Sequence, residues 1–212
     1  WVAKTANLLA DELDVGPGAV VALALPRHWL VPVVALATWA AGATLAPGGD
    51  PAEADLVVCG PDGLAAASAA AQVLAAALAP LGAPFPPGTL PLGVRDLGRE
   101  VPPQADRFTG PPPALTDPAL RLPTAASAAG VHGALDHAAL VTAAEDLADG
   151  LGVTEGGRLL LAGALDPVAE VLASAVLPLV RGASVVLVVH PDPARQPDRM
   201  RAERVSVAYG LT

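Results

Sequence analysis

The chain has 212 residues, of which 53% are hydrophobic and 16% are charged, and its formal net charge is −9. This composition excludes intrinsic disorder, and the acidic balance excludes binding to nucleic acid or to an anionic membrane through a basic surface. The single cysteine, Cys59, excludes an internal disulfide and a cysteine-based zinc site, and its apolar surroundings in the sequence indicate a structural thiol.

The first 60 residues alternate predicted helices and strands. Apolar residues at helical spacing predict a helix over residues 1–14, which Gly16-Pro17-Gly18 ends. A continuous apolar run predicts a strand buried on both faces over residues 19–25. The other elements expected here are a helix over residues 29–41 and strands over residues 43–46 and 55–59. This order indicates α/β architecture with layered, mostly parallel sheets and flanking helices.

The alanine-rich segment over residues 62–79 allows two interpretations. Alanine favours a single helix, whereas residues 73–78 also suit a strand that follows a short helix. The sequence leaves both alternatives open.

Proline-rich segments divide the chain. They predict loops over residues 80–91 and 102–113, with a short helix near residues 94–100 between them. We therefore expect a first α/β lobe over residues 1–110 and a second over residues 111–212, packed together as one compact unit.

The second half shows clearer helix signals. Asp136 is predicted to cap a helix over residues 137–149 that ends at Gly150, and Asp166-Pro167 is predicted to open another. That second helix should bend or end at Pro178 and close at Gly182. The remaining expected elements are strands over residues 119–122, 158–162, 184–189 (buried) and 205–209, and a helix over residues 199–204.

The order of these segments resembles the N-terminal domain of acyl-adenylate-forming enzymes, the superfamily of AMP-binding acyl-CoA synthetases, luciferase and peptide-synthetase adenylation domains. Two stretches carry the resemblance. The first runs from Thr5-Ala6-Asn7-Leu8-Leu9 through Gly16-Pro17-Gly18-Ala19-Val20 to Ala40-Ala41-Gly42-Ala43. The second is residues 172–186, LASAVLPLVRGASVV, followed by Arg204-Val205-Ser206-Val207. The resemblance covers nearly the whole chain and implies a truncated, degenerate relative with the N-terminal domain only.

The resemblance also implies where a nucleotide would bind. In this superfamily a Ser/Thr/Gly-rich loop ending in Pro-Lys-Gly holds the phosphates through backbone N–H groups, hydroxyls and a cation. The matching segment here is residues 124–133, TAASAAGVHG, in which alanines replace most hydroxyl residues and a histidine stands near the lysine position. The residues of this vestigial phosphate loop that could still contact a ligand are Thr124, Ser127, Gly130, His132 and Gly133.

The lysine count bears on the same question. The chain contains one lysine, Lys4, inside its first predicted helix, where we expect it on a solvated face. The resembled enzymes use one lysine in the phosphate loop and another in a C-terminal domain, and Lys4 matches neither position. We therefore expect no catalytic residue in this chain.

The remaining polar residues match no other known kind of site. The four histidines lack zinc-ligand spacing, so no metal is expected. No serine lies in Gly-x-Ser-x-Gly, and no Gly-x-Gly-x-x-Gly follows a predicted strand. His28 is expected at a helix start, and His190 in a loop at a strand end, which is where α/β proteins bind ligands.

Three functional hypotheses follow. The first is a non-catalytic relative that serves as a binding or scaffold protein for an acyl group or a partner chain, with no cofactor. The second is a residual ligase-like enzyme that binds ATP or AMP with magnesium through Thr124, Ser127 and His132. The third is a homo-oligomeric module, because the mean hydropathy of +0.51 exceeds what one small core needs. We favour the first. No long apolar stretch has the leucine and phenylalanine density of a membrane span, so we expect a cytoplasmic protein.

Overall fold

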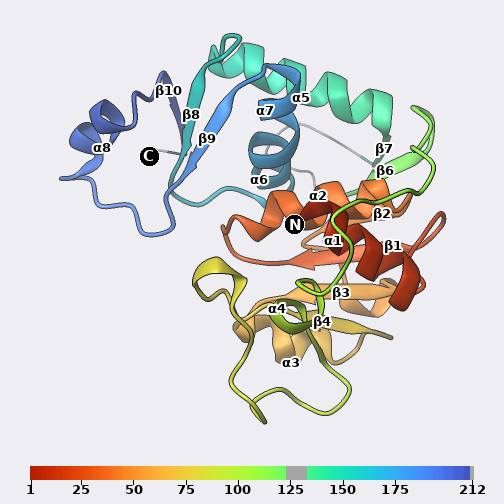
Figure 1. Cartoon of the computed structure of the whole chain (residues 1–212). Coiled ribbons are helices and arrows are strands. Elements are labelled where there is room, and N and C mark those ends of the chain that lie inside the picture. The colour runs from red at the N-terminus through yellow and green to blue at the C-terminus, as the bar shows by residue number, and fades with distance from the viewer. Residues whose placement is uncertain (123–132, 211–212) are drawn as a thin grey trace.

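A seven-stranded sheet forms the larger part of the protein in the computed structural model, which describes residues 1–122 and 133–210 (Figure 1). Its strand order is β5-β4-β3-β1-β2-β6-β7, and every neighbouring pair is parallel except β6 and β7. The strands are β1 (Val20–Ala24), β2 (Thr44–Pro47), β3 (Leu56–Cys59), β4 (Val73–Ala75), β5 (Arg95–Asp96), β6 (Pro118–Arg121) and β7 (Ala134–Asp136). The predicted α/β class with mostly parallel strands is confirmed.

The two faces of this sheet are covered by different helices, because successive strand residues point in opposite directions. Val21 and Leu23 of β1 pack into the main core with the helices α1 (Val2–Asn7) and α2 (Leu30–Ala40). Ala22 packs on the other face with the short helix α3 (Leu64–Ala67). A strand buried on both sides must be apolar throughout, which is why β1 and β3 read as continuous apolar runs.

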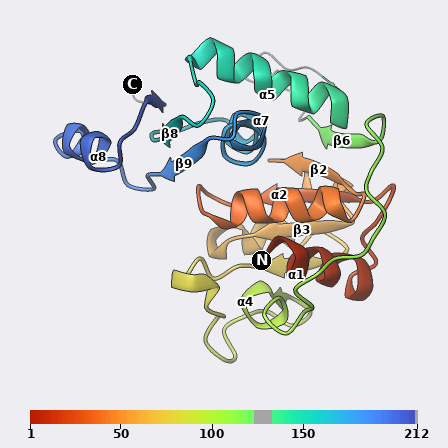
Figure 2. The same cartoon turned by 45° about the horizontal axis from the view of Figure 1, so that its top comes forward.

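The second sheet is smaller and all parallel, in the order β10-β8-β9. Its strands are β8 (Arg158–Leu161), β9 (Ser184–Leu187) and β10 (Val207–Tyr209). Leu159 and Leu161 face the helices α5 (His137–Leu151) and α7 (Leu177–Val180), whereas Leu160 faces α8 (Gln196–Ala202). Figure 2 shows α5 and α7 above α2, and the main core joins α2, α5 and α6 (Pro167–Val171).

The order of strands crosses the expected lobe boundary. The seven-stranded sheet takes β6 and β7 from beyond residue 110, and the whole three-stranded sheet lies beyond it. The division into lobes at residue 110 stays a proposal.

Local structure decides the cases that the sequence left open or got wrong. Residues 62–79 form α3 followed by β4, the second of the two alternatives. The helix over residues 137–149 continues past Gly150 and ends at Gly152, whose φ of +72° suits a left-handed cap. The strand β9 is half-buried rather than buried, because it lies at the edge of its sheet. The sequence also missed β5 and β7, which are too short for periodicity to reveal.

Three further helix details complete the picture. The first helix passes into a π-helical segment over Leu8–Glu12, and α6 does the same over Leu172–Val176 before α7. A short helix α4 covers Leu97–Glu100, within the predicted residues 94–100. None of the helices in the described part of the chain combines the length and the apolar character that a membrane span needs.

Candidate functional site

The main cavity of interest, here called the inter-sheet cleft, lies where strands of both sheets end. Its volume is about 450 Å³. Residues from the carboxyl ends of β1, β2, β8 and β9 line it together with residues of α2 and α6, and most of them are apolar: Leu23, Ala24, Leu25, Pro26, Arg27, Val31, Pro47, Gly48, Gly163, Ala164, Leu165, Pro167, Glu170, Val171, Val189 and His190. Open α/β sheets bind ligands at the carboxyl ends of their strands, and a mostly apolar cleft of this volume suits a small molecule.

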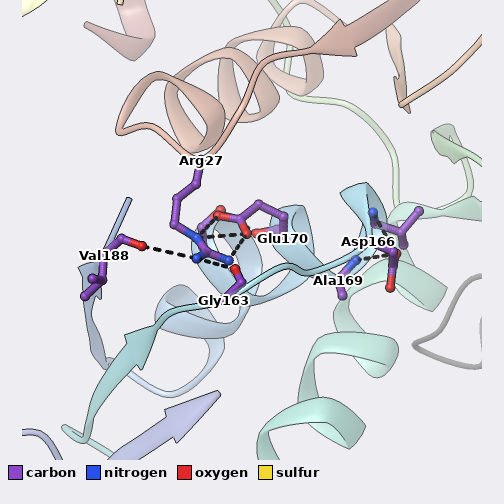
Figure 3. A network of polar contacts seen from close by, with 8 residues as sticks. Arg27, Gly163, Asp166, Ala169, Glu170 and Val188 are labelled. Atoms are coloured by element: carbon purple, nitrogen blue, oxygen red, sulfur yellow. Dashed lines mark hydrogen bonds and ion pairs between the residues drawn. The ribbon is translucent and has the colours of Figure 1, made fainter. Parts of the chain in front are cut away.

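An ion pair between Arg27 and Glu170 crosses the wall of the inter-sheet cleft (Figure 3). The guanidinium Nη2 donates to Glu170 Oε2 at 2.7 Å, and Nε lies 3.0 and 3.1 Å from the two carboxylate oxygens. The arginine and glutamate side chains are only 9% and 12% exposed. Water therefore screens this pair far less than an exposed one.

The same arginine also holds the ends of the second sheet. Its Nη1 donates to the carbonyl of Gly163 at 2.7 Å and to that of Val188 at 3.3 Å. Figure 3 shows these two carbonyls reaching the guanidinium from the chain after β8 and the chain after β9. Arg27 follows β1 of the first sheet, so one side chain ties the first sheet to α6, β8 and β9. These contacts occupy Nε and Nη1 and leave little donor capacity for a ligand.

The helix that carries Glu170 is built to hold it in place. Asp166 caps α6, with its Oδ1 accepting from the N–H groups of Val168 and Ala169 at 3.0 Å each. Glu170 lies one turn later, and its carbonyl accepts from the hydroxyl of Ser174 at 2.6 Å inside the π-helical segment. The predicted cap at Asp166 is thereby confirmed.

The sequence analysis did not single out Arg27 or Glu170, although a signal was present. Glu170 is the one charged residue between Pro167 and Val180, a stretch that the helical pattern buries. A buried charge needs a partner, and Arg27 directly follows a strand buried on both faces. The pairing itself joins residues 143 positions apart, which no local pattern reveals.

Most of the predicted phosphate-loop residues lie outside the described part of the structure. These are Thr124, Ser127, Gly130 and His132. Gly133 is described: it is exposed, its φ is +81°, and its carbonyl accepts from the N–H of Leu122 at 3.1 Å. That hydrogen bond brings together the two described residues that flank the segment, at the end of β6. Whether Gly133 contacts a ligand stays a prediction.

The helix that follows this segment already has an anion at its first turn. The Asp136 side chain accepts from the N–H of Ala139 at 2.8 Å and caps α5, as predicted. A carboxylate in this position uses the N–H groups and positive end of the helix dipole that a phosphate would need. This arrangement disfavours phosphate binding at the start of α5.

Lys4 is not on a solvated helix face, and that prediction was wrong. Its Nζ donates to the carbonyls of Pro102 at 2.9 Å and Gln104 at 2.5 Å, and it lies 3.3 Å from a carboxylate oxygen of Asp106. The side chain is 23% exposed. The lysine therefore holds the proline-rich connection against α1, and it does not line the inter-sheet cleft.

The remaining candidate residues behave as structural groups. Cys59 is buried at the end of β3, and burial raises the pKa of its thiol, so it is not a reactive thiolate at neutral pH. His190 is exposed in the loop after β9, as predicted, and lines the inter-sheet cleft. Within residues 1–122 and 133–210, no group of His, Cys, Asp and Glu side chains is placed to hold a metal ion.

Acid should destabilise this protein through two histidines. Burial lowers the pKa of His28 and of His137 below the ordinary value of 6.5, and for His137 it outweighs the opposing charges of Asp117 and Asp136. The unfolded chain then binds protons more readily, so this contribution is complete above pH 6.5 and is lost as the pH falls through the lowered folded-state values. Urea unfolding between pH 7.5 and pH 5 should show a falling free energy of unfolding, with a shallower fall in His28→Gln and His137→Gln. An unchanged slope in both variants would contradict this assignment.

The comparison with solved structures confirms the fold expected from the resemblance. An acyl-CoA synthetase from Brucella canis matches 98% of this chain with a TM-score of 0.73 and 21% identity. The N-terminal domain of FACL13 from Mycobacterium tuberculosis matches 96% of the chain with a TM-score of 0.70 and 15% identity. The chain spans 40% and 52% of these two structures. It thus has the fold of the N-terminal domain of acyl-CoA synthetases.

A comparison of sequences gives the family. No protein-family model matches the chain. A curated protein of Mycobacterium tuberculosis (strain ATCC 25618 / H37Rv), described as a TIGR03089 family protein, is 33% identical over 216 residues, which cover 97% of this chain and 80% of that protein. Because the chain covers twice as large a share of this relative as of the Brucella synthetase, the relative is itself about half as long as that enzyme. The chain belongs to the TIGR03089 family.

Proposed function

We propose that this protein is a non-catalytic binding protein that uses the synthetase N-terminal fold to hold a ligand without adenylating it. The observation that carries the proposal is the state of its cations. The single lysine is bound to the proline-rich connection, and the one Arg or Lys side chain among the described residues lining the inter-sheet cleft, Arg27, is bound by Glu170 and two carbonyls. Neither is available to neutralise a triphosphate.

The lining of the inter-sheet cleft indicates the kind of ligand. Arg27 and Glu170 neutralise each other, and most of the other lining side chains are aliphatic or proline. Binding a net charge in such a cleft costs desolvation that no free counter-charge repays. The ligand proposed is therefore an uncharged, mainly apolar group such as an acyl chain, or an apolar segment of a partner protein.

Calorimetry with ATP and magnesium tests the loss of nucleotide chemistry. We expect no heat of binding up to millimolar ATP, because no free cation faces the carboxyl ends of the strands in the described structure. A full-length acyl-CoA synthetase titrated in the same buffer provides the positive control. Micromolar ATP affinity for this chain would overturn the proposal.

A residual adenylating enzyme is the second candidate. It is favoured by one observation: the flanks of the predicted loop, Leu122 and Gly133, meet at the end of β6, beside the other carboxyl-terminal strand ends. Pyrophosphate exchange with a panel of carboxylic acids and magnesium-ATP measures this activity directly. Exchange that is lost in His132→Ala would support this candidate, and absence of exchange would reject it.

Self-association is a separate proposal that is compatible with ligand binding. Several leucines are well exposed among the described residues: Leu81, Leu92, Leu115 and Leu179. Exposed apolar side chains of this kind are common at contacts between copies. Light scattering that shows a dimer or larger assembly at high concentration would support it, and a monomer at every concentration would reject it.

A further inference from the structure

A second cavity lies on the opposite side of Gly163 from the ion pair, at the carboxyl end of the second sheet. Its volume is about 440 Å³. The chain after β9, the helix α8 and the ends of β8 and β10 line it, through Gly163, Pro191, Pro193, Gln196, Pro197, Met200 and Gly210. None of these lining residues carries a charge, and three prolines give the wall a rigid apolar surface. A volume of this size accommodates a small organic molecule.

One polar group in this wall is left without a partner. Gln196 is 6% exposed, and its Nε2 is buried with no hydrogen-bond acceptor in the described structure. The amide oxygen is already used, since it accepts from Nη1 of Arg199 at 3.3 Å. Buried amide donors are almost always satisfied, and leaving one unpaired costs free energy. An acceptor supplied from the cavity would remove this cost.

From the cavity and its unpaired donor together, we infer that α8 and the loop after β9 form a binding site for an uncharged amphiphile that carries a carbonyl oxygen. The aliphatic part packs against the prolines and Met200, whose flexible thioether adapts to the shape of the ligand. The carbonyl accepts the hydrogen bond from Gln196. An anion or a cation is disfavoured, because no lining side chain offers an opposite charge. This site does not depend on the function proposed for the inter-sheet cleft.

The sequence supplies a direct reporter for this site. Met200 is the only methionine in the chain, so labelling the methionine methyl group with carbon-13 places a single native NMR signal in the cavity wall. Met200→Leu assigns the signal and separates it from that of any initiator methionine. Octanamide is the probe, octylammonium is the matched probe without an acceptor, and octanoate is the charged probe with one.

We expect octanamide to shift the Met200 signal saturably, with at least tenfold weaker effects from octylammonium and octanoate. Gln196→Leu should weaken octanamide binding about tenfold, the effect of one hydrogen bond, while the melting temperature of the free protein stays equal or rises, since the unpaired amide is gone. Asp198→Asn, an exposed change on the same helix, should leave binding unchanged. A Met200 signal that octanamide does not move, or equal affinity in wild type and Gln196→Leu, would overturn the inference.

Discussion

Replacing Arg27 by methionine is expected to lower the free energy of unfolding by about 3–5 kcal/mol, because it strands a buried carboxylate. Glu170 is 12% exposed and its listed side-chain partner in the ion pair is Arg27. The same change removes the donor to the carbonyls of Gly163 and Val188, which join the second sheet to the first. Urea unfolding at pH 7 measures the loss.

The double variant Arg27→Met/Glu170→Leu separates the lost pair from the stranded charge. With both charges removed, an apolar contact can replace the pair, and we expect much of the lost stability to return. Arg121→Met provides a matched control, because its ion pair with Glu53 is exposed on both sides and should matter by less than about 1 kcal/mol. A double variant no more stable than Arg27→Met would show that the two carbonyl contacts, rather than the ion pair, hold the sheets together.

Replacing Gly163 by alanine is expected to destabilise the protein by roughly 3–5 kcal/mol, since it combines backbone strain with an overlap that no side chain can relieve. Gly163 has a φ of +63°, and a Cβ added there would lie 2.0 Å from the carbonyl oxygen of Gly210. Gly210 has the reciprocal constraint, with its Cβ 2.0 Å from the carbonyl oxygen of Ala162. Thermal and urea unfolding of Gly163→Ala and Gly210→Ala measure the effect.

Gly156 provides the control for the backbone conformation alone. Its φ is +69°, close to that of Gly163, but a Cβ there meets nothing within 4 Å. Gly156→Ala should therefore cost only the left-handed conformation, about 1–2 kcal/mol. Equal losses in Gly156→Ala and Gly163→Ala would mean that the chain ends of β8 and β10 separate easily, and the close approach would then have little structural importance.

The parts of the fold that the sequence predicted well are those in which one local pattern has one structural outcome. The apolar runs at β1 and β3 can only be buried parallel strands, and Asp136 and Asp166 have the side chain that caps a helix start. The elements that it missed, β5 and β7, contain two and three residues, and only pairing with a neighbouring strand defines them. The end of α5 was misplaced because Gly150 is tolerated inside a helix while Gly152 takes the left-handed cap.

The sequence by itself determined the class of the fold, the resemblance to adenylate-forming enzymes, and the presence of a single lysine. Each of these is a property of residue types and their order along the chain. Only the tertiary structure decided where that lysine binds, which buried charges meet, and where cavities remain. Lys4 and Asp106, Arg27 and Glu170, and Gly163 and Gly210 are far apart in the chain, and their contacts exist only after the two sheets and their helices have packed together. Packing, rather than local preference, therefore positions the residues on which both proposed binding sites depend.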